Sequence, residues 1–233
     1  MSAPPDDVVH RIHDLYLTEV VEGLKLCPFA RRSREQGCVH RPIVRCEGED
    51  PSPSAAARTL VDVASAHADA EIVLITFIGD SPRLATPEGL DGFVREVRVA
   101  YAAAQGAPRP FFMVGFHRDS GRVADGDTPP KLTPDSLVPL LRRTPDPVIQ
   151  CVDTGTLERA RAIAQAAAHD RMVAELTALN PAMRAIAERS VASDSQLSAD
   201  IARANYNAVA TGEGRAELER KIAEIVRIRD ASG

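Results

Sequence analysis

The sequence predicts an α/β protein in which a largely parallel, four-stranded sheet carries flanking helices and an all-helical C-terminal region follows. Three observations predict this fold. Four short apolar runs have the length of strands, helical segments alternate with them, and the strand pattern stops after residue 153. Strands that alternate with helices are typical of a parallel sheet with helices packed on it. The 233 residues suffice for one large domain, or for one domain with a helical appendage.

The chain begins with an amphipathic helix, predicted over residues 7–25. Its apolar residues recur every three or four positions, as on the buried face of a helix: Val8, Ile12, Leu15, Tyr16, Val20 and Leu24. Gly23 weakens the last turn, and Pro28 prevents the helix from continuing. We therefore expect Cys27 just after the C-terminal end of a helix, in a turn that Pro28 stiffens.

Four apolar runs predict the strands, at residues 42–46, 71–79, 110–116 and 148–152. The second and third runs are almost continuously apolar, which is typical of strands covered on both faces. Three times a Ser or Thr followed by Pro precedes a helical pattern, because the hydroxyl favours the N-cap and Pro the first helical position. These three helices are predicted over residues 53–67, 87–104 and 134–142.

Residues 154–233 are predicted to be a helical region, and residues 1–153 the α/β domain that precedes it. Residues 156–178 are rich in Ala and look helical, and further helical segments extend to about residue 229. We expect this region to pack on the sheet domain. The alternative is an oligomerisation arm that joins copies of the chain.

The composition narrows the range of partners. The net charge is −5 and there is no block of Lys or Arg, which argues against binding to nucleic acid or to an anionic membrane surface. Aromatic residues make up 4% of the chain and Trp is missing, so little surface is present for stacking on bases. No apolar run approaches the roughly 20 residues that span a bilayer. We expect a cytoplasmic protein with reduced cysteines that acts on a small-molecule substrate.

The turn that holds Cys27 is the first candidate for chemistry. The negative end of the preceding helix dipole should raise the pKa of the thiol, whereas Arg31 and Arg32 should lower it. The thiol could be a nucleophile, a metal ligand or a substrate contact. Free cysteine is also among the most buried residue types, and the local sequence favours this structural interpretation.

Two further candidates follow later strands. His117 ends an apolar run, at the end of a strand where α/β proteins bind ligands, and it suits a base or a metal ligand. The alternative is a histidine that bonds to the backbone. Arg143 ends a short helix in a Pro-rich turn, where its guanidinium suits a carboxylate. The alternatives for Arg143 are a cation at a helix C-terminus or a salt bridge to Asp135.

Two histidine patterns are weaker candidates. His10 and His13 share one face of the first helix, and we expect them to be solvated. Cys38, His40 and Cys46 could form a metal cluster, but their spacing fits no zinc template.

Three segments together resemble a bacterial and plant family whose function is unknown. In order, they are Gly23-Leu24-Lys25-Leu26-Cys27-Pro28-Phe29-Ala30, then Phe116-His117-Arg118, then the stretch from Pro134-Asp135-Ser136 to Arg143-Thr144-Pro145-Asp146-Pro147. The likeness covers about residues 7–160 and implies that Cys27, His117, Asp135 and Arg143 are site residues. Gln150 stands where the family has a second His, so the resemblance also implies a lost or altered activity.

The same order of segments is similar, more faintly, to the YqcI/YcgG family, which includes haem-dependent N-hydroxylating oxygenases. This resemblance implies a haem-dependent oxidoreductase that acts on a small polar metabolite. His117 would be the axial metal ligand, Arg143 would pair with a haem propionate or a substrate carboxylate, and Phe29 and Cys27 would line the pocket. A second hypothesis is a thiol-dependent enzyme with Cys27 as nucleophile and His117 as base. A third is a non-enzymatic small-molecule-binding protein in which both residues are structural.

Overall fold

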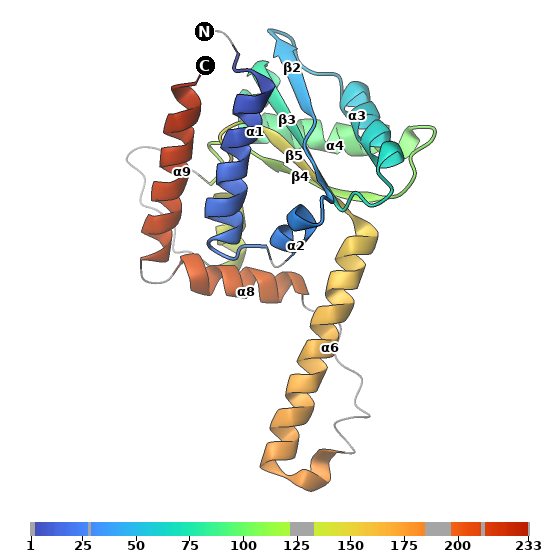
Figure 1. Cartoon of the computed structure of the whole chain (residues 1–233), viewed down its shortest axis with the longest axis vertical. Helices are drawn as coiled ribbons and strands as arrows, with labels where there is room; N and C mark the ends of the chain where they lie inside the picture. Colours follow the sequence, from blue (N-terminus) through green and yellow to red (C-terminus); the bar gives the residue numbers. More distant parts are fainter. Residues whose placement is uncertain (1–2, 28, 122–132, 185–196, 211–212, 233) are drawn as a thin grey trace.

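A computed structural model gives the fold of the chain (Figure 1). It describes all residues except 1–2, 28, 122–132, 185–196, 211–212 and 233. One mixed sheet lies between two sets of helices, and the long helix α6 extends away from both (Figure 1).

The strands of this sheet are β1 (Val39–His40), β2 (Ile43–Glu47), β3 (Ile72–Asp80), β4 (Phe111–Phe116) and β5 (Val148–Asp153). β1 and β2 both pair in parallel with β3, one after the other along the same edge, and β5 lies antiparallel between β3 and β4. The four longer strands agree with the four predicted runs to within one residue at each end. The two-residue strand β1 was not predicted.

The prediction of a largely parallel sheet is wrong at β5. The chain leaves β4 at Phe116 and enters β5 at Val148, and these two residues are partners in the antiparallel ladder. The connection over residues 117–147, which includes α5 (Pro134–Leu141), thus leaves and rejoins the sheet at the same end. A helix between two strands makes them parallel only when it crosses from one end of the sheet to the other. The alternation of helices and strands does not reveal which case applies.

Helices α3 (Pro53–Ala66) and α4 (Pro87–Ala103) cover one face of the sheet, and η2 (Arg83–Ala85) precedes α4. The core on this face is continuous and contains most of the large buried side chains of the strands and of both helices: Leu60, Ile75, Phe77, Phe93, Val97, Met113 and Ile149. The strands and both helices therefore share one continuous apolar core on this face.

The predicted starts of these helices are confirmed. Ser52 and Thr86 are the N-caps, and a proline is the first helical residue in each case. The Thr86 hydroxyl accepts a hydrogen bond from the Gly89 N–H at 3.1 Å, which satisfies one of the unpaired donors at the helix start.

The other face of the sheet meets a helical layer. Its members are α1 (Asp6–Leu15), the π-helical segment η1 (Tyr16–Glu22), α5, α8 (Leu197–Val209) and α9 (Gly214–Asp230). These helices pack on one another through a core of their own, and the sheet contributes a separate, smaller cluster around Ile72, Leu74 and Val148. Because the two clusters are distinct, space remains between the helical layer and the sheet.

The C-terminal region begins with α6 (Thr154–Leu179), which starts directly after β5 and is followed by η3 (Pro181–Met183). The chain then returns through α8 to α9, which lies beside α1, so that the two termini are close together (Figure 1). The helical layer is thus built from both ends of the chain. Among the described residues, none of the helices combines the length and apolar character that a membrane crossing requires.

The buried carboxylate of Asp146 joins the helices α1 and α9 to the loop before β5. The side chain of Asp146, in the loop before β5, is only 7% exposed. The Nε of Arg229 on α9 donates to both its oxygens, at 2.8 and 3.1 Å, and Nε2 of His13 on α1 lies 3.3 Å from Oδ2. The expectation that His13 is solvated is therefore wrong. A buried charge is tolerated only when it is paired and hydrogen-bonded, so this network fixes α1 and α9 relative to the loop.

Replacing Asp146 with Ala should destabilise the fold by about 3–5 kcal/mol, because it leaves the guanidinium of Arg229 buried without a partner. Urea denaturation followed by circular dichroism measures this. The matched control is Asp230→Ala, at the end of α9, which breaks the exposed ion pair with Arg118 and should cost less than about 1 kcal/mol. Equal effects of the two substitutions would contradict the assigned role of Asp146.

Candidate functional site

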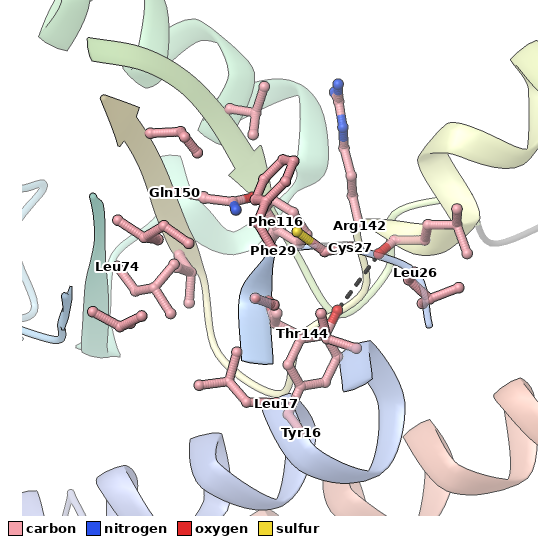
Figure 2. Close-up of a pocket in the computed structure, with 18 of the residues that line it drawn as sticks. Tyr16, Leu17, Leu26, Cys27, Phe29, Leu74, Phe116, Arg142, Thr144 and Gln150 are labelled. Carbon is pink, nitrogen blue, oxygen red and sulfur yellow. Dashed lines mark hydrogen bonds between the residues drawn. The ribbon is translucent and has the colours of Figure 1, made fainter. Parts of the chain in front are cut away.

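A cavity of about 340 Å³ lies between the sheet and the helical layer, and we call it the main cavity (Figure 2). Its walls are mostly apolar side chains from η1, α5, α8 and the strands β1, β3, β4 and β5, among them Leu17, Val21, Leu74, Phe116, Leu141 and Val148. Apolar cavities of this size that carry a few polar groups are typical of sites for small molecules. The main cavity is therefore the candidate functional site.

Cys27 lies in the wall of the main cavity, together with Phe29 (Figure 2). The chain reverses after η1 at Lys25, whose φ of 56° is in the left-handed region, and α2 (Ala30–Glu35) begins after the turn. Burial raises the pKa of the Cys27 thiol, and the backbone N–H groups of Phe29 and Ala30, which bond to the sulfur, lower it by less. Cys27 is thus a neutral thiol near pH 7.

Glu22 ties the Cys27 turn to the end of η1. Its carboxylate is buried and accepts hydrogen bonds from Nε of Arg34 at 2.6 Å and from Nε of Arg31 at 3.3 Å. These guanidinium groups hold the pKa of the Glu22 carboxyl below its ordinary value, with the hydrogen bond from Arg34 as the largest cause. Helix α2, and with it the Cys27 turn, is therefore held firmly against η1.

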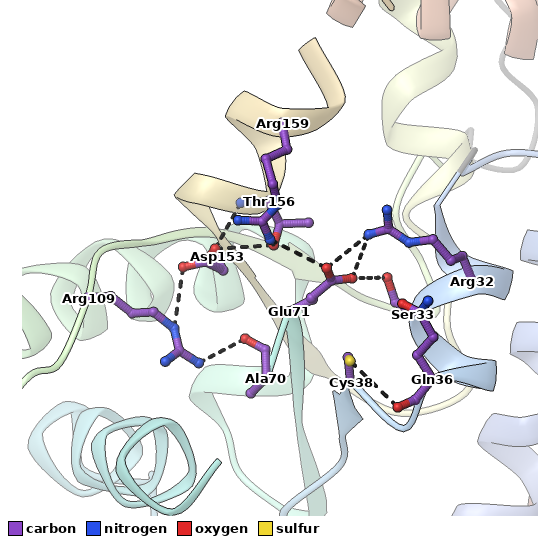
Figure 3. Close-up of polar contacts among 10 residues, drawn as sticks. All are labelled: Arg32, Ser33, Gln36, Cys38, Ala70, Glu71, Arg109, Asp153, Thr156 and Arg159. Atoms are coloured by element: carbon purple, nitrogen blue, oxygen red, sulfur yellow. Dashed lines mark hydrogen bonds and ion pairs between the residues drawn. The ribbon is translucent and has the colours of Figure 1, made fainter. Parts of the chain in front are cut away.

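Glu71 holds the other side of α2 against the sheet (Figure 3). It lies just before β3 and accepts hydrogen bonds from Arg32 at 2.9 Å and from the Ser33 hydroxyl at 2.6 Å. Arg159 of α6 lies 3.4 Å from the same carboxylate. Both cations beside Cys27, Arg31 and Arg32, are thus paired with carboxylates, and neither contributes to the shift in the thiol pKa.

Three polar side chains in the wall have no hydrogen bond or ion pair within the described part of the chain: Arg142, Gln150 and Asn205. Asn205 is buried, with 8% of its surface exposed. Gln150 stands on β5 between its ladder partners Leu74 and Val114. A few polar groups in the wall of an apolar cavity fix the orientation of a ligand, so these three side chains are the natural contacts for a bound molecule.

His13 also lines the main cavity, and its orientation is set by Asp146. The sequence did contain a signal for its burial, because His13 has helical spacing from the buried residues Val9 and Tyr16. His10 is half-buried, and its Nε2 lies 3.0 Å from the backbone oxygen of Arg41.

His117 lies elsewhere, in a second cavity at the ends of β3 and β4. Side chains alternate between the two faces of a strand. Phe112, Val114 and Phe116 face the main cavity, so the next residue, His117, points to the opposite side, beside Phe77 and Leu84. The structure therefore separates His117 from Cys27.

The ring of His117 is occupied by backbone contacts. The N–H of Asp119 donates to Nδ1 at 3.1 Å, and a further backbone hydrogen bond joins the ring to Leu84. Burial is the main cause of a lowered pKa, so the ring is neutral near pH 7. A neutral imidazole has one donor and one acceptor nitrogen, so Nδ1 accepts and Nε2 carries the proton. In this arrangement neither nitrogen has a free lone pair for a metal ion.

The remaining predicted residues also lie apart from Cys27. Arg143 lines neither of these two cavities, and its Nε donates to the backbone oxygen of Arg118 at 3.3 Å. Asp135 belongs to α5, but its side chain lies outside the described part of the structure. Of the predicted site residues, the structure brings together Cys27 and Phe29, and Gln150, which replaces the second His of the family, lines the same cavity. Arg142, the neighbour of the predicted Arg143, lines the main cavity in its place.

These residues do not fit a haem group ligated by His117. The imidazole has no free lone pair, and Arg143 lies outside the cavity that contains Phe29. A thiol mechanism with Cys27 as nucleophile and His117 as base also lacks geometric support, because the two side chains line different cavities.

Comparisons with protein-family models, curated proteins and solved structures give no match to this chain. The family resemblance of the segments around Cys27, His117 and Arg143 therefore stays a prediction, as does the haem-dependent activity that it implies.

Cys27 should react with iodoacetamide more slowly at pH 7 than free cysteine does, because burial raises its pKa and the thiolate is the reactive form. The rate should increase as the pH rises above neutrality. Peptide mapping by mass spectrometry measures both for the folded protein, with the urea-unfolded chain as the control. Labelling of folded Cys27 as fast as free cysteine would show that the thiol is activated.

Proposed function

We propose that this chain binds a small amphipathic molecule, with an apolar body and one anionic end, in the main cavity. The observation that carries the proposal is the cavity itself, a largely apolar space of about 340 Å³ with a few unpartnered polar groups in its wall. An apolar lining supplies most of the binding free energy, and the few polar groups fix the orientation of the ligand.

The anionic end would be bound by Arg142. Two arginines reach the wall, and Arg34 is already paired with Glu22. Arg142 has no such partner among the described residues, so its guanidinium is available for a carboxylate or phosphate. Gln150 and Asn205 would hydrogen-bond to polar substituents along the ligand, which gives specificity beyond apolar contact.

Cys27 is a neutral thiol in this proposal and contacts the ligand without reacting. Its sulfur accepts hydrogen bonds from backbone N–H groups, and among the described residues no histidine or carboxylate is bonded to it. A cysteine nucleophile needs an adjacent base or a lowered pKa, and neither feature accompanies Cys27. Of the three hypotheses raised by the sequence, the non-enzymatic binding protein agrees best with this geometry.

The wild-type chain should bind decanoate, a fatty acid with an apolar body and one carboxylate, as measured by isothermal titration calorimetry. Val114→Phe should abolish this binding, because the larger ring fills the cavity beside Gln150. Ala202→Leu is a second variant that fills the cavity, from the α8 side. Thermal unfolding checks that both variants fold. Decanoate binding that is absent in the wild type, or unchanged in both folded variants, would disprove the proposal.

Arg142→Gln should weaken decanoate binding about tenfold and leave the binding of decanol unchanged, since a charge-assisted hydrogen bond contributes about 1.5–3 kcal/mol. The matched control is Arg143→Gln, which removes the neighbouring cation outside the main cavity and should change neither affinity. Equal losses from the two substitutions would mean that Arg142 has no specific role.

A further inference from the structure

Three ligand-type side chains meet on the side of the sheet opposite the main cavity. They are His40 at the end of β1, His67 at the C-cap of α3, and Asp69 in the loop before β3. Val39 lines the main cavity, so strand alternation points His40 the other way, toward α3. The cluster is thus separate from the proposed binding site.

One ligand atom from each of the three side chains can be chosen so that all lie within 4.8 Å of one another. The imidazole rings of His40 and His67 are stacked, with centroids 4.0 Å apart and an angle of 27° between the planes. Ligand atoms bound to one tetrahedral zinc ion lie about 3.3 Å apart, given zinc–nitrogen distances of about 2.0–2.1 Å. Small rotations of the exposed His67 and Asp69 side chains would close the difference.

Nε2 of His40 is an independent sign that something is bound here. It is shielded from solvent and has no hydrogen-bond partner. Few polar atoms in folded proteins are left in this state, and each calls for an explanation such as a bound ion. A metal ion between the two histidines and Asp69 would satisfy this nitrogen.

The backbone that carries His67 is held rigidly. Its carbonyl accepts hydrogen bonds from the Ala70 N–H and from the side chain of Arg109, both at 3.1 Å, and Arg109 also bonds to the Ala70 carbonyl at 2.9 Å. Arg109 is in turn paired with Asp153 at 3.3 Å, which offsets its positive charge next to the cluster. A site held in this way loses little entropy when an ion binds.

The charge of the cluster suits a cation. Imidazole side chains bind metal ions in their neutral form, so His40 and His67 add no charge of their own to the bound site. The Asp69 carboxylate supplies one negative charge.

We propose that His40, His67 and Asp69 bind a divalent transition-metal ion of the zinc type, with water completing the coordination. Two imidazoles and one carboxylate are ligands that zinc accepts, and imidazole disfavours Mg²⁺ and Ca²⁺. The ion would link β1 to the segment between α3 and β3. The sequence pattern Cys38-Val39-His40 with Cys46 does not form this site, since Cys46 is not part of the cluster and the second histidine comes from another element.

Isothermal titration of untagged, metal-free protein with Zn²⁺ should show one saturable site per chain. His67→Ala and Asp69→Asn should each weaken Zn²⁺ binding about tenfold or more, as loss of a ligand or of its support does in known sites. Both residues are exposed, so both variants should fold. Saturation with Zn²⁺ should also raise the melting temperature of the wild type, because an ion that binds only the folded state stabilises it.

The matched control is the double variant His169→Ala, Asp170→Asn. This histidine–carboxylate pair lies on α6, outside the cluster, so its removal should leave the Zn²⁺ affinity unchanged. Titration with Co²⁺ should give visible absorption bands of a low-coordinate site in the wild type, and these should be lost in His40→Ala. The proposal is overturned if the wild type has no saturable Zn²⁺ site. It is also overturned if the site persists in the His67→Ala, Asp69→Asn double variant.

Discussion

The architecture depends on one buried carboxylate, that of Asp146. A charge in the interior must be paired, and the partners that Asp146 finds, His13 and Arg229, come from the first and last helices of the chain. Satisfying this one group therefore requires that α1 and α9 lie side by side, next to the loop that leads into β5. The helical layer on the second face of the sheet follows from this requirement.

The main cavity is a consequence of how that layer is held. On the first face, α3 and α4 pack their apolar side chains directly into the sheet, and the core there is continuous. On the second face, the helices bury most of their apolar residues against one another, and Asp146 and Glu22 hold them through polar contacts at the ends and sides of the layer. Less apolar surface is left to close onto the sheet, so a space remains around Leu74 and Phe116.

Strand alternation decides which candidate residues share a site. Phe116 and His117 are neighbours in the chain, yet one lines the main cavity and the other the second cavity. The same alternation separates Val39 from His40 across the sheet. Order along the sequence groups Cys27, His117 and Arg143 into one motif, but the pleat of the strands and the short reach of side chains divide them in space.

The sequence by itself determined the positions of the four longer strands, the helix starts at Ser52 and Thr86, and the turn that holds Cys27. These features depend on local causes, namely hydrophobic periodicity, capping hydroxyl groups and the restricted backbone of proline. Only the tertiary structure decided the antiparallel direction of β5, because that depends on whether the connection after Phe116 crosses the sheet. It alone also paired His13 with Asp146 and brought His40 to His67, since contacts between distant segments are set by packing and by the pairing of buried charges.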